Sequence, residues 1–262
     1  MKLYHYTSIR SFKSIWKSQA LRFSESKGTN DYFERNKIIT ADNGILKYNG
    51  EETELEVLRH NIVSIYHQIN NFKQISLSLD YTQDLKGYAS PMMWGQYSRS
   101  KDNNDNCDGV CIELDISKLY LESKPLYSKA IIYEDNVQAI KLGGYDFSGE
   151  NAIEKFIDIN QDLIFFTKHR HWEHENEYRI VSNNLAYLDI SDAISGVYVL
   201  GMDSPSMKEV EKVTQNPSII NVLISSGING ITLSKYNLQK YRDIIKRNAE
   251  RKKKNTNRQA VY

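Results

Sequence analysis

The segment Leu3-Tyr-His-Tyr-Thr-Ser-Ile-Arg-Ser-Phe-Lys-Ser-Ile-Trp16 places a strand and a helix in succession near the start of the chain. Residues 3–6 have the composition of a strand. Ser8 is suited to cap a helix, because a serine oxygen can accept the hydrogen bonds of the first backbone N–H groups. Apolar side chains then recur at helical spacing, at Ile9, Phe12, Ile15 and Trp16. The segment therefore predicts a strand-to-helix unit at the start of the fold.

Similar patterns continue along the chain. Apolar periodicity predicts helices over residues 51–71, 92–97 and 152–167, after Pro205, and from Lys235. Alternating or β-branched runs predict strands at 21–24, 74–79, 109–114, 130–133, 178–182, 185–190, 197–200 and 221–224. Strands follow one another in places and alternate with helices in others. This order favours an α+β fold with helices packed on a central sheet.

Composition limits the class of protein. With 262 residues and 40% apolar content, we expect one domain over residues 1–246, followed by a frayed basic tail at 247–262. The net charge of +1 excludes a global attraction to nucleic acid or to an anionic membrane. Cys107 and Cys111 are expected to be reduced thiols, without a second pair to complete a zinc site. No leader pattern and no apolar run of roughly 18 residues occurs, so a cytoplasmic location without membrane contact is expected.

Histidines and carboxylates are concentrated between Lys168 and Arg179. One interpretation is a metal site formed by His169, His171 and His174 with the neighbouring acids. The spacing argues against it, because His171 and His174 are three residues apart and not four, as in a helical zinc motif. We therefore expect no metal.

A second interpretation of this segment uses the acids. If residues 175–182 form a strand, then Glu175, Glu177 and Arg179 project from one face. Two carboxylates on one face suit the cleavage of a glycosidic bond, in which one acid stabilises an oxocarbenium-like transition state and the other orients a nucleophile. A charged edge strand, with Arg179 paired to a carboxylate, explains the same pattern without any chemistry.

Five blocks of sequence carry a family resemblance. They are LYHYTS, LRFSESKGTNDYFE, WGQYS, GVCIEL and W-x-x-E-N-E-Y-R, in this order over residues 3–182. This series resembles the bacterial family catalogued as domain of unknown function 2971, over about two thirds of the chain. The segment Gln74 to Asp80 departs from the Cys-Phe-Ser-like strand that the family leads us to expect.

The order of a histidine in the first strand, a tyrosine after a central helix and a glutamate in a late strand is also similar to ADP-ribosyltransferases of the His-Tyr-Glu type. The segment Asn176-Glu-Tyr-Arg-Ile-Val181 resembles their catalytic strand. This resemblance implies a single domain with a split, mixed or antiparallel central sheet and flanking helices. It also implies NAD as the substrate.

The same resemblance implies roles for individual residues. Glu177 would hold the nicotinamide ribose and stabilise the oxocarbenium ion, and Glu175 would position the acceptor. Tyr97 would stack on the nicotinamide, although Trp94 is an equally good equivalent. The residues implied at the ribose and phosphate end of NAD are His5, Tyr6, Thr7, Ser8, Asn30 and Arg179.

The activity implied is ADP-ribosyl transfer from NAD to a macromolecule, either protein or nucleic acid. An intracellular toxin or antiphage defence effector, restrained by an antitoxin or another regulatory partner, would have such an activity. Two alternatives stay open. One is a metal-assisted hydrolase or nuclease that uses the segment from His169 to Glu177, and the other is a non-catalytic sensor or binding module that uses surface aromatics such as Trp94.

Overall fold

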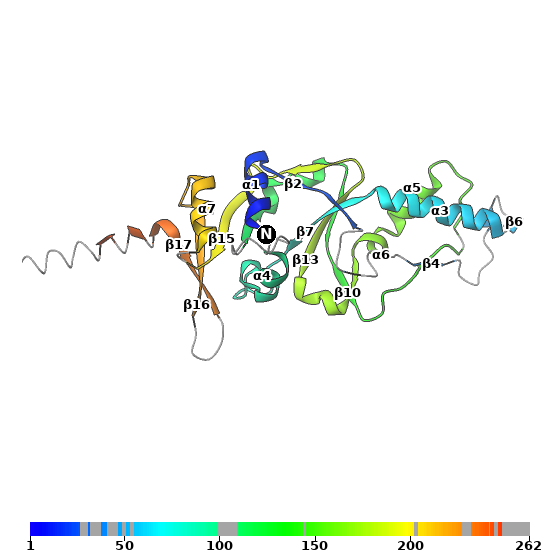
Figure 1. The fold of residues 1–262 in the computed structure, drawn as a ribbon. Helices are drawn as coiled ribbons and strands as arrows, with labels where there is room; N and C mark the ends of the chain where they lie inside the picture. Colours follow the sequence, from blue (N-terminus) through cyan, green and yellow to red (C-terminus); the bar gives the residue numbers. More distant parts are fainter. Residues whose placement is uncertain are drawn as a thin grey trace, which may run out of the picture. The chain divides into compact units, whose positions relative to one another are not determined.

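The computed structural model describes residues 1–26, 31, 38–40, 47–48, 51–52, 55–98, 109–143, 145–201, 204–226, 232–240, 242–243 and 246–247. The chain is a mixture of helices and strands and forms two compact units (Figure 1). Unit 1 contains Met1–Ala20, Leu79–Leu119 and Asp189–Tyr262, and unit 2 contains Leu21–Ser78 and Tyr120–Leu188. The expected combination of helices with a mixed sheet is confirmed.

Unit 1 is built on five strands in the order β17-β16-β15-β8-β1. Their bounds are β1 (Lys2–Thr7), β8 (Val110–Asp115), β15 (Ile194–Leu200), β16 (Ile220–Ser226) and β17 (Thr232–Asn237). Neighbouring strands are antiparallel except β15 and β16, which are parallel. A helical connection, α7 (Pro205–Thr214), joins that parallel pair, as parallel strands require a long crossover.

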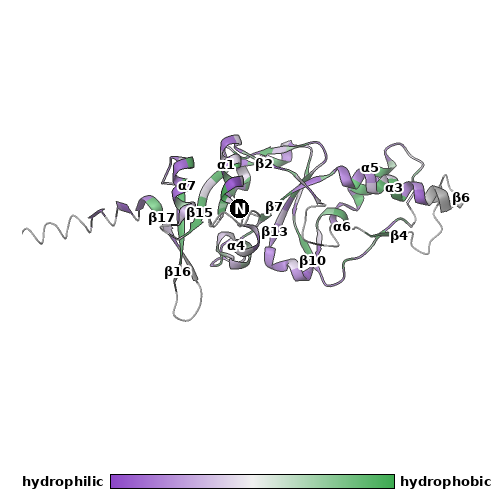
Figure 2. Ribbon diagram, viewed as in Figure 1, coloured by the Kyte–Doolittle hydropathy of each residue, from purple (hydrophilic) through white to green (hydrophobic). Residues whose placement is uncertain are grey.

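Serine caps begin α1 (Ile9–Ser18), α4 (Pro91–Tyr97) and α7 in unit 1. The hydroxyl oxygens of Ser8, Ser90 and Ser204 each accept a hydrogen bond from the backbone N–H three residues later. The 3₁₀ turn η3 (Ile116–Lys118) is capped by the Asp115 carboxylate, which accepts from the Ser117 backbone N–H, whereas η2 (Gly87–Ala89) has no side-chain cap. In Figure 2, β15 is rich in hydrophobic residues, whereas α7 is largely hydrophilic.

Gly109 lies immediately before β8, where three segments of unit 1 meet. A Cβ atom at this position would lie 2.2 Å from the Ser98 carbonyl oxygen and 2.3 Å from the Thr7 carbonyl oxygen. Only glycine allows the backbone to approach this closely.

Unit 2 contains a second group of antiparallel strands in the order β7-β13-β9, with β3 beside β7. Their bounds are β3 (Ser24–Glu25), β7 (Lys73–Ser78), β9 (Tyr127–Ala130) and β13 (Glu177–Ser182). The helices of this unit are α3 (Leu55–Asn71), α5 (Ala152–Ile159), α6 (Gln161–Phe165) and the 3₁₀ turns η4 (Leu121–Ser123) and η5 (Arg170–Glu175).

Three short two-stranded sheets complete unit 2. They pair β10 (Ile132–Glu134) with β12 (Thr167–His169), β11 (Ile140–Lys141) with β4 (Ile39–Thr40), and β5 (Lys47–Tyr48) with β6 (Glu51–Glu52). Two further short strands, β2 (Ala20–Arg22) and β14 (Tyr187–Asp189), lie where the chain passes from one unit to the other.

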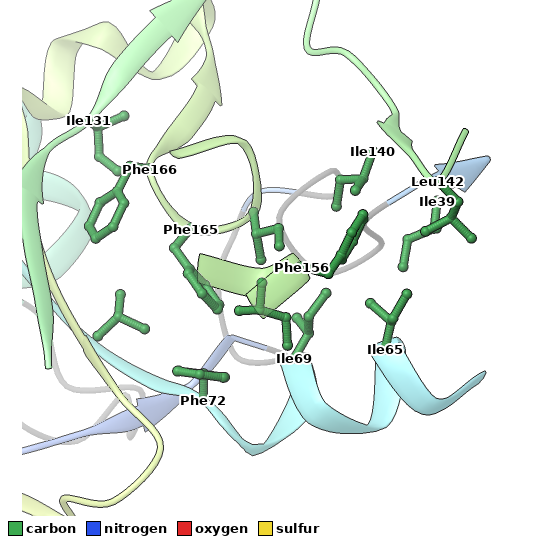
Figure 3. Packing of buried hydrophobic residues seen from close by; sticks show 13 residues of the cluster. Ile39, Ile65, Ile69, Phe72, Ile131, Ile140, Leu142, Phe156, Phe165 and Phe166 are labelled. Atoms are coloured by element: carbon green, nitrogen blue, oxygen red, sulfur yellow. The ribbon is translucent and has the colours of Figure 1, made fainter. Parts of the chain in front are cut away.

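The core of unit 2 forms where α3 faces α5 and α6. Ile65, Ile69 and Phe72 point toward Phe156 and Phe165 (Figure 3). The Phe72 and Phe165 rings lie with their centroids 4.7 Å apart. This packing anchors the segment that leads from α6 into β12 and η5.

The structure corrects several predictions of secondary structure. The helix expected from residue 51 begins at Leu55, and residues 51–52 form β6. Residues 152–167 do not form one helix: the chain breaks at Asn160, whose side-chain nitrogen donates to the Phe156 carbonyl oxygen at 2.8 Å, and Thr167 begins a strand. Asparagine competes with the helix for backbone partners in this way. Residues 130–133 are divided between β9 and β10. Lys235 lies in β17, paired with Leu223, so the helical residues expected from Lys235 begin at Leu238.

Other predictions are confirmed or lie outside the described residues. The strand-to-helix start, the helix after Pro91 and the strand at 109–114 are confirmed within one residue at each end. The polar loop at 101–108, the turn at Gly227–Gly230, Asn30 and Cys107 lie outside the described residues. No helix in the described part of the chain is long and apolar enough to cross a membrane.

Candidate functional site

Four charged side chains converge in the interior of unit 2. Their exposed fractions are 6% for Lys168, 4% for Glu175, 3% for Glu177 and 1% for Arg179. We call these residues the charged quartet. Two cations and two anions cancel, so the quartet carries no net charge although each member is removed from water. Burial of this kind is tolerated only when every charge has a partner.

Neighbouring elements of unit 2 bring the four side chains of the quartet together. Lys168 comes from β12, and Glu175 is the last residue of η5. Asn176 adopts a left-handed backbone conformation, with φ of 43°, and turns the chain so that β13 begins at Glu177. The Tyr133 hydroxyl accepts a hydrogen bond from the Glu177 backbone N–H at 2.9 Å. The continuous strand expected from residue 175 is therefore replaced by a turn and a strand that starts two residues later.

Two nitrogen atoms of the Arg179 side chain donate hydrogen bonds to Glu177. The Nε of Arg179 donates to Glu177 Oε1 at 2.8 Å and its Nη2 donates to Glu177 Oε2 at 3.0 Å. The remaining nitrogen, Nη1, donates to the Phe165 carbonyl oxygen at 2.6 Å. A bidentate arginine fixes both the position and the plane of a carboxylate.

Lys168 links the two acids. Its Nζ lies 2.6 Å from Glu175 Oε2 and 2.8 Å from Glu177 Oε2. The same ammonium lies 5.5 Å from the centre of the Trp172 ring, at a distance suited to a cation–π contact. Sequence reasoning missed Lys168, because the expected helix extended to residue 167. A lysine directly after the apolar run Ile164-Phe-Phe-Thr167 was the signal that could have revealed it.

These contacts determine the charge of Glu177. Burial by itself would raise the pKa of the Glu177 carboxyl, but Arg179 and Lys168 outweigh it and lower the pKa well below its usual range. Burial raises the pKa of the neighbouring Tyr133 hydroxyl, which stays protonated. Glu177 is therefore an ionised, oriented carboxylate at neutral pH.

A serine hydroxyl lies next to Glu177 across the sheet. Ser78 is the direct partner of Glu177 in the β7–β13 ladder, so the two side chains project from the same face. The Ser78 side chain is 1% exposed, and its Oγ has no hydrogen-bond partner among the residues that the structure describes. A buried hydroxyl without a partner is unusual and indicates a place where a missing group could bind.

The histidines of the same segment bond locally. His169 Nδ1 accepts from the His171 backbone N–H at 3.2 Å, and His174 Nδ1 lies 3.1 Å from the His171 carbonyl oxygen. Among the described residues, no three histidine, cysteine or acidic side chains are placed to hold a metal ion.

The other predicted site residues that the structure describes lie in unit 1, and several have structural roles there. Ser8 caps α1. Tyr6 donates to the Gly87 carbonyl oxygen and packs edge-on against Trp94, with ring centroids 5.2 Å apart. Trp94 is itself buried and donates to the Tyr88 carbonyl oxygen at 2.8 Å.

The remaining unit 1 candidates are close to these residues. Tyr97 is half-buried against the same aromatic cluster. His5 is half-buried in the middle of β1, and Thr7 is buried at its end. Unit 1 thus brings the tyrosine and tryptophan candidates together, and unit 2 brings together Glu175, Glu177 and Arg179.

Comparison with known proteins gives one family match. Residues 93–180, about a third of the chain, match the family described as "Protein of unknown function (DUF2971)". The matched segment includes most of α4, all of β8 and the whole charged quartet. This match supports the first family resemblance of the sequence. No match was found among curated proteins or among solved structures.

Proposed function

We propose that the protein is an NAD-dependent ADP-ribosyltransferase in which Glu177 stabilises the ribosyl cation. The observation that supports this proposal is the state of Glu177, a carboxylate held ionised and oriented by a bidentate arginine. Loss of nicotinamide leaves positive charge on the ribose ring, and a preorganised anion lowers the energy of that transition state.

Ser78 gives independent support for a ligand beside Glu177. A ribose presents neighbouring hydroxyl groups, and one could bond to the unpartnered Ser78 Oγ while another bonds to Glu177. Glu175, held beside Glu177 by the shared lysine, would orient the acceptor nucleophile. The bond from the ribose to nicotinamide breaks, the bond to the acceptor forms, and the acceptor's proton is released.

The acceptor we propose is a macromolecule, either protein or nucleic acid. Modification of a cell's own macromolecules would make the protein a toxin or an antiphage effector, restrained by a partner. The proposed roles of His5, Thr7 and Tyr97 in holding NAD follow from the sequence resemblance and stay predictions.

A non-catalytic binding module is the second candidate function. The observation that favours it is that Glu177 already accepts three internal hydrogen bonds, two from Arg179 and one from Lys168. A purely structural ion cluster would have the same appearance. No comparable observation favours the metal-dependent hydrolase.

The test compares wild type, Glu177→Gln and Glu173→Gln. Each protein is incubated with NAD labelled on its adenylate, with and without cell lysate, and label transfer and nicotinamide release are followed. Glu173 is the matched control, because it is an exposed acid of the same turn. Circular dichroism must accompany the assay, since Glu177→Gln removes the anion that neutralises two buried cations.

We expect nicotinamide release from wild type and Glu173→Gln, and its loss in a folded Glu177→Gln. Equal release by folded Glu177→Gln would rule out the assigned role of Glu177. Absence of release, of label transfer and of NAD binding in wild type would leave the binding module as the better reading.

A further inference from the structure

Lys168 and Arg179 hold Glu177 in different ways. The guanidinium of Arg179 engages both carboxylate oxygens and is itself tied to the Phe165 carbonyl oxygen. Lys168 contributes one contact to Glu177, at Oε2, and has a second carboxylate available at 2.6 Å, that of Glu175. The planar guanidinium of Arg179, which makes three hydrogen bonds, is harder to displace from Glu177 than the flexible Lys168 ammonium, which has Glu175 as an alternative partner.

We propose that the Lys168 ammonium lies where the positively charged nicotinamide ribosyl group of NAD binds. Lys168 must therefore leave Glu177 before NAD can bind. In the structure its ammonium donates to Glu177 Oε2 beside Arg179 Nη2, and when NAD binds, Lys168 would give up this contact and keep its contact with Glu175. Glu177 Oε2 would then accept a ribose hydroxyl and face the positive charge of the nicotinamide ribosyl group. This inference rests on the proposed function.

The local charge at Glu177 Oε2 supports the exchange. The quartet is neutral while Lys168 bridges the two acids, and it stays neutral if the ammonium shifts toward Glu175. The oxidised nicotinamide ring carries a positive charge, so the carboxylate oxygen that loses one cation gains another. Trp172, whose ring lies against the ammonium, borders Lys168 on the side of η5. Lys168 would therefore be a positioning residue that sets the affinity for NAD.

Two variants of Lys168 should change NAD affinity in opposite directions. The pair Lys168→Met with Glu175→Gln removes one cation and one anion, which leaves the Glu177–Arg179 pair intact and neutral. Without the competing ammonium, we expect NAD to bind about tenfold more tightly, which is the effect of one charge-assisted hydrogen bond. Lys168→Arg should bind NAD about tenfold more weakly, because a fork bridging both acids is harder to displace.

The matched control is Lys129→Met with Asp162→Asn, which removes a different lysine–carboxylate pair of unit 2. Lys129 Nζ lies 2.6 Å from Asp162 Oδ2, and both side chains are about half exposed. This control should bind NAD as wild type does. NADH, whose nicotinamide ring is uncharged, should gain less than NAD in the Lys168→Met, Glu175→Gln protein. A general loosening of the fold would instead affect both nucleotides equally.

Affinities are measured by calorimetry, and folding by circular dichroism. The inference is overturned if wild type binds NAD and the double variant gains nothing, or if folded Lys168→Arg binds as wild type does. If the double variant does not fold, the NAD affinity of Lys168→Arg relative to wild type tests the inference by itself. If neither wild type nor any folded variant binds NAD, the proposed function fails and this inference fails with it.

Discussion

Arg179 is one of the most completely buried side chains of the described chain, although its guanidinium stays charged at any pH that a protein experiences. Its interaction with Glu177 therefore has to compensate for a full charge in the interior. We expect Arg179→Met to lower the free energy of unfolding by about 3–5 kcal/mol, because it leaves an uncompensated anion. Arg170→Met, at an exposed pair with Asp135, should change it by less than about 1 kcal/mol. Urea unfolding measures both, and equal effects would contradict the assignment.

The lowered pKa of Glu177 makes stability depend on pH. In the unfolded chain this carboxyl titrates near its ordinary value of 4.5, and in the folded protein it titrates well below that. Its contribution is therefore complete above pH 4.5 and declines as the pH falls, by up to about 1.4 kcal/mol per pH unit. The stability difference between wild type and Glu177→Gln should shrink on acidification. A difference that is constant between pH 7 and pH 3 would show that the pKa is not lowered.

Ser78 and Ser182 form a natural pair for comparison. Both are buried, but the Ser182 Oγ donates to the Pro125 carbonyl oxygen and accepts from the backbone N–H groups of Asn184 and Leu185. Ser182→Ala should lower the free energy of unfolding by about 1–3 kcal/mol. Ser78→Ala should leave it unchanged or raise it slightly, because it removes a hydroxyl with no partner. Thermal unfolding tests this, and a clear loss in Ser78→Ala would show that its hydroxyl has a partner.

At the scale of the elements, the predictions that the structure confirms are those that depend on residues close together in the sequence. Ser8 and Pro91 mark helix starts that the structure contains, since capping and the fixed φ of proline act within one turn. Glu177 and Arg179 were also recognised as neighbours on one face. These predictions needed only the chain adjacent to each residue.

Strand pairing over long sequence distances and single side-chain bonds explain the predictions that were wrong. Lys235 lies in a strand because β17 pairs with β16, and nothing near Lys235 in the sequence indicates that pairing. The break at Asn160 depends on one side-chain bond, which releases Thr167 into β12. Lys168 was missed for the same reason, since its partners become visible only once β12 lies beside β10 and η5 turns back.

The junction between η5 and β13 gives a prediction about an element. Asn176 has a positive φ, which glycine adopts without strain and β-branched residues adopt only with difficulty. Asn176→Gly and Asn176→Val both remove the asparagine side chain, so their difference isolates the backbone. We expect the valine variant to be less stable than the glycine variant by about 1–2 kcal/mol. Equal urea midpoints would contradict a requirement for the left-handed turn.

At the scale of the whole molecule, both units are assembled from separated segments of the chain. Unit 1 needs residues 189–262, because β15 pairs with β8 and contributes Val197, Tyr198 and Val199 to the buried core. We expect a protein that ends at residue 188 to lose cooperative unfolding of unit 1, since β8 would have an open edge. Hydrogen exchange of the β8 amides measures this. Protection equal to that of the full chain would show that β15 does not stabilise β8.

The neutrality of the charged quartet constrains how this protein could change during evolution. Removal of the charge of any one member leaves an unbalanced charge in the interior, whereas removal of an acid together with a base restores the balance. Single substitutions that remove a charge at Lys168, Glu175, Glu177 or Arg179 should therefore be depleted from a library selected for folding, relative to compensated pairs and to substitutions that keep the charge. The quartet would be inherited as a set, so that a new specificity at this site has to arise through coupled substitutions.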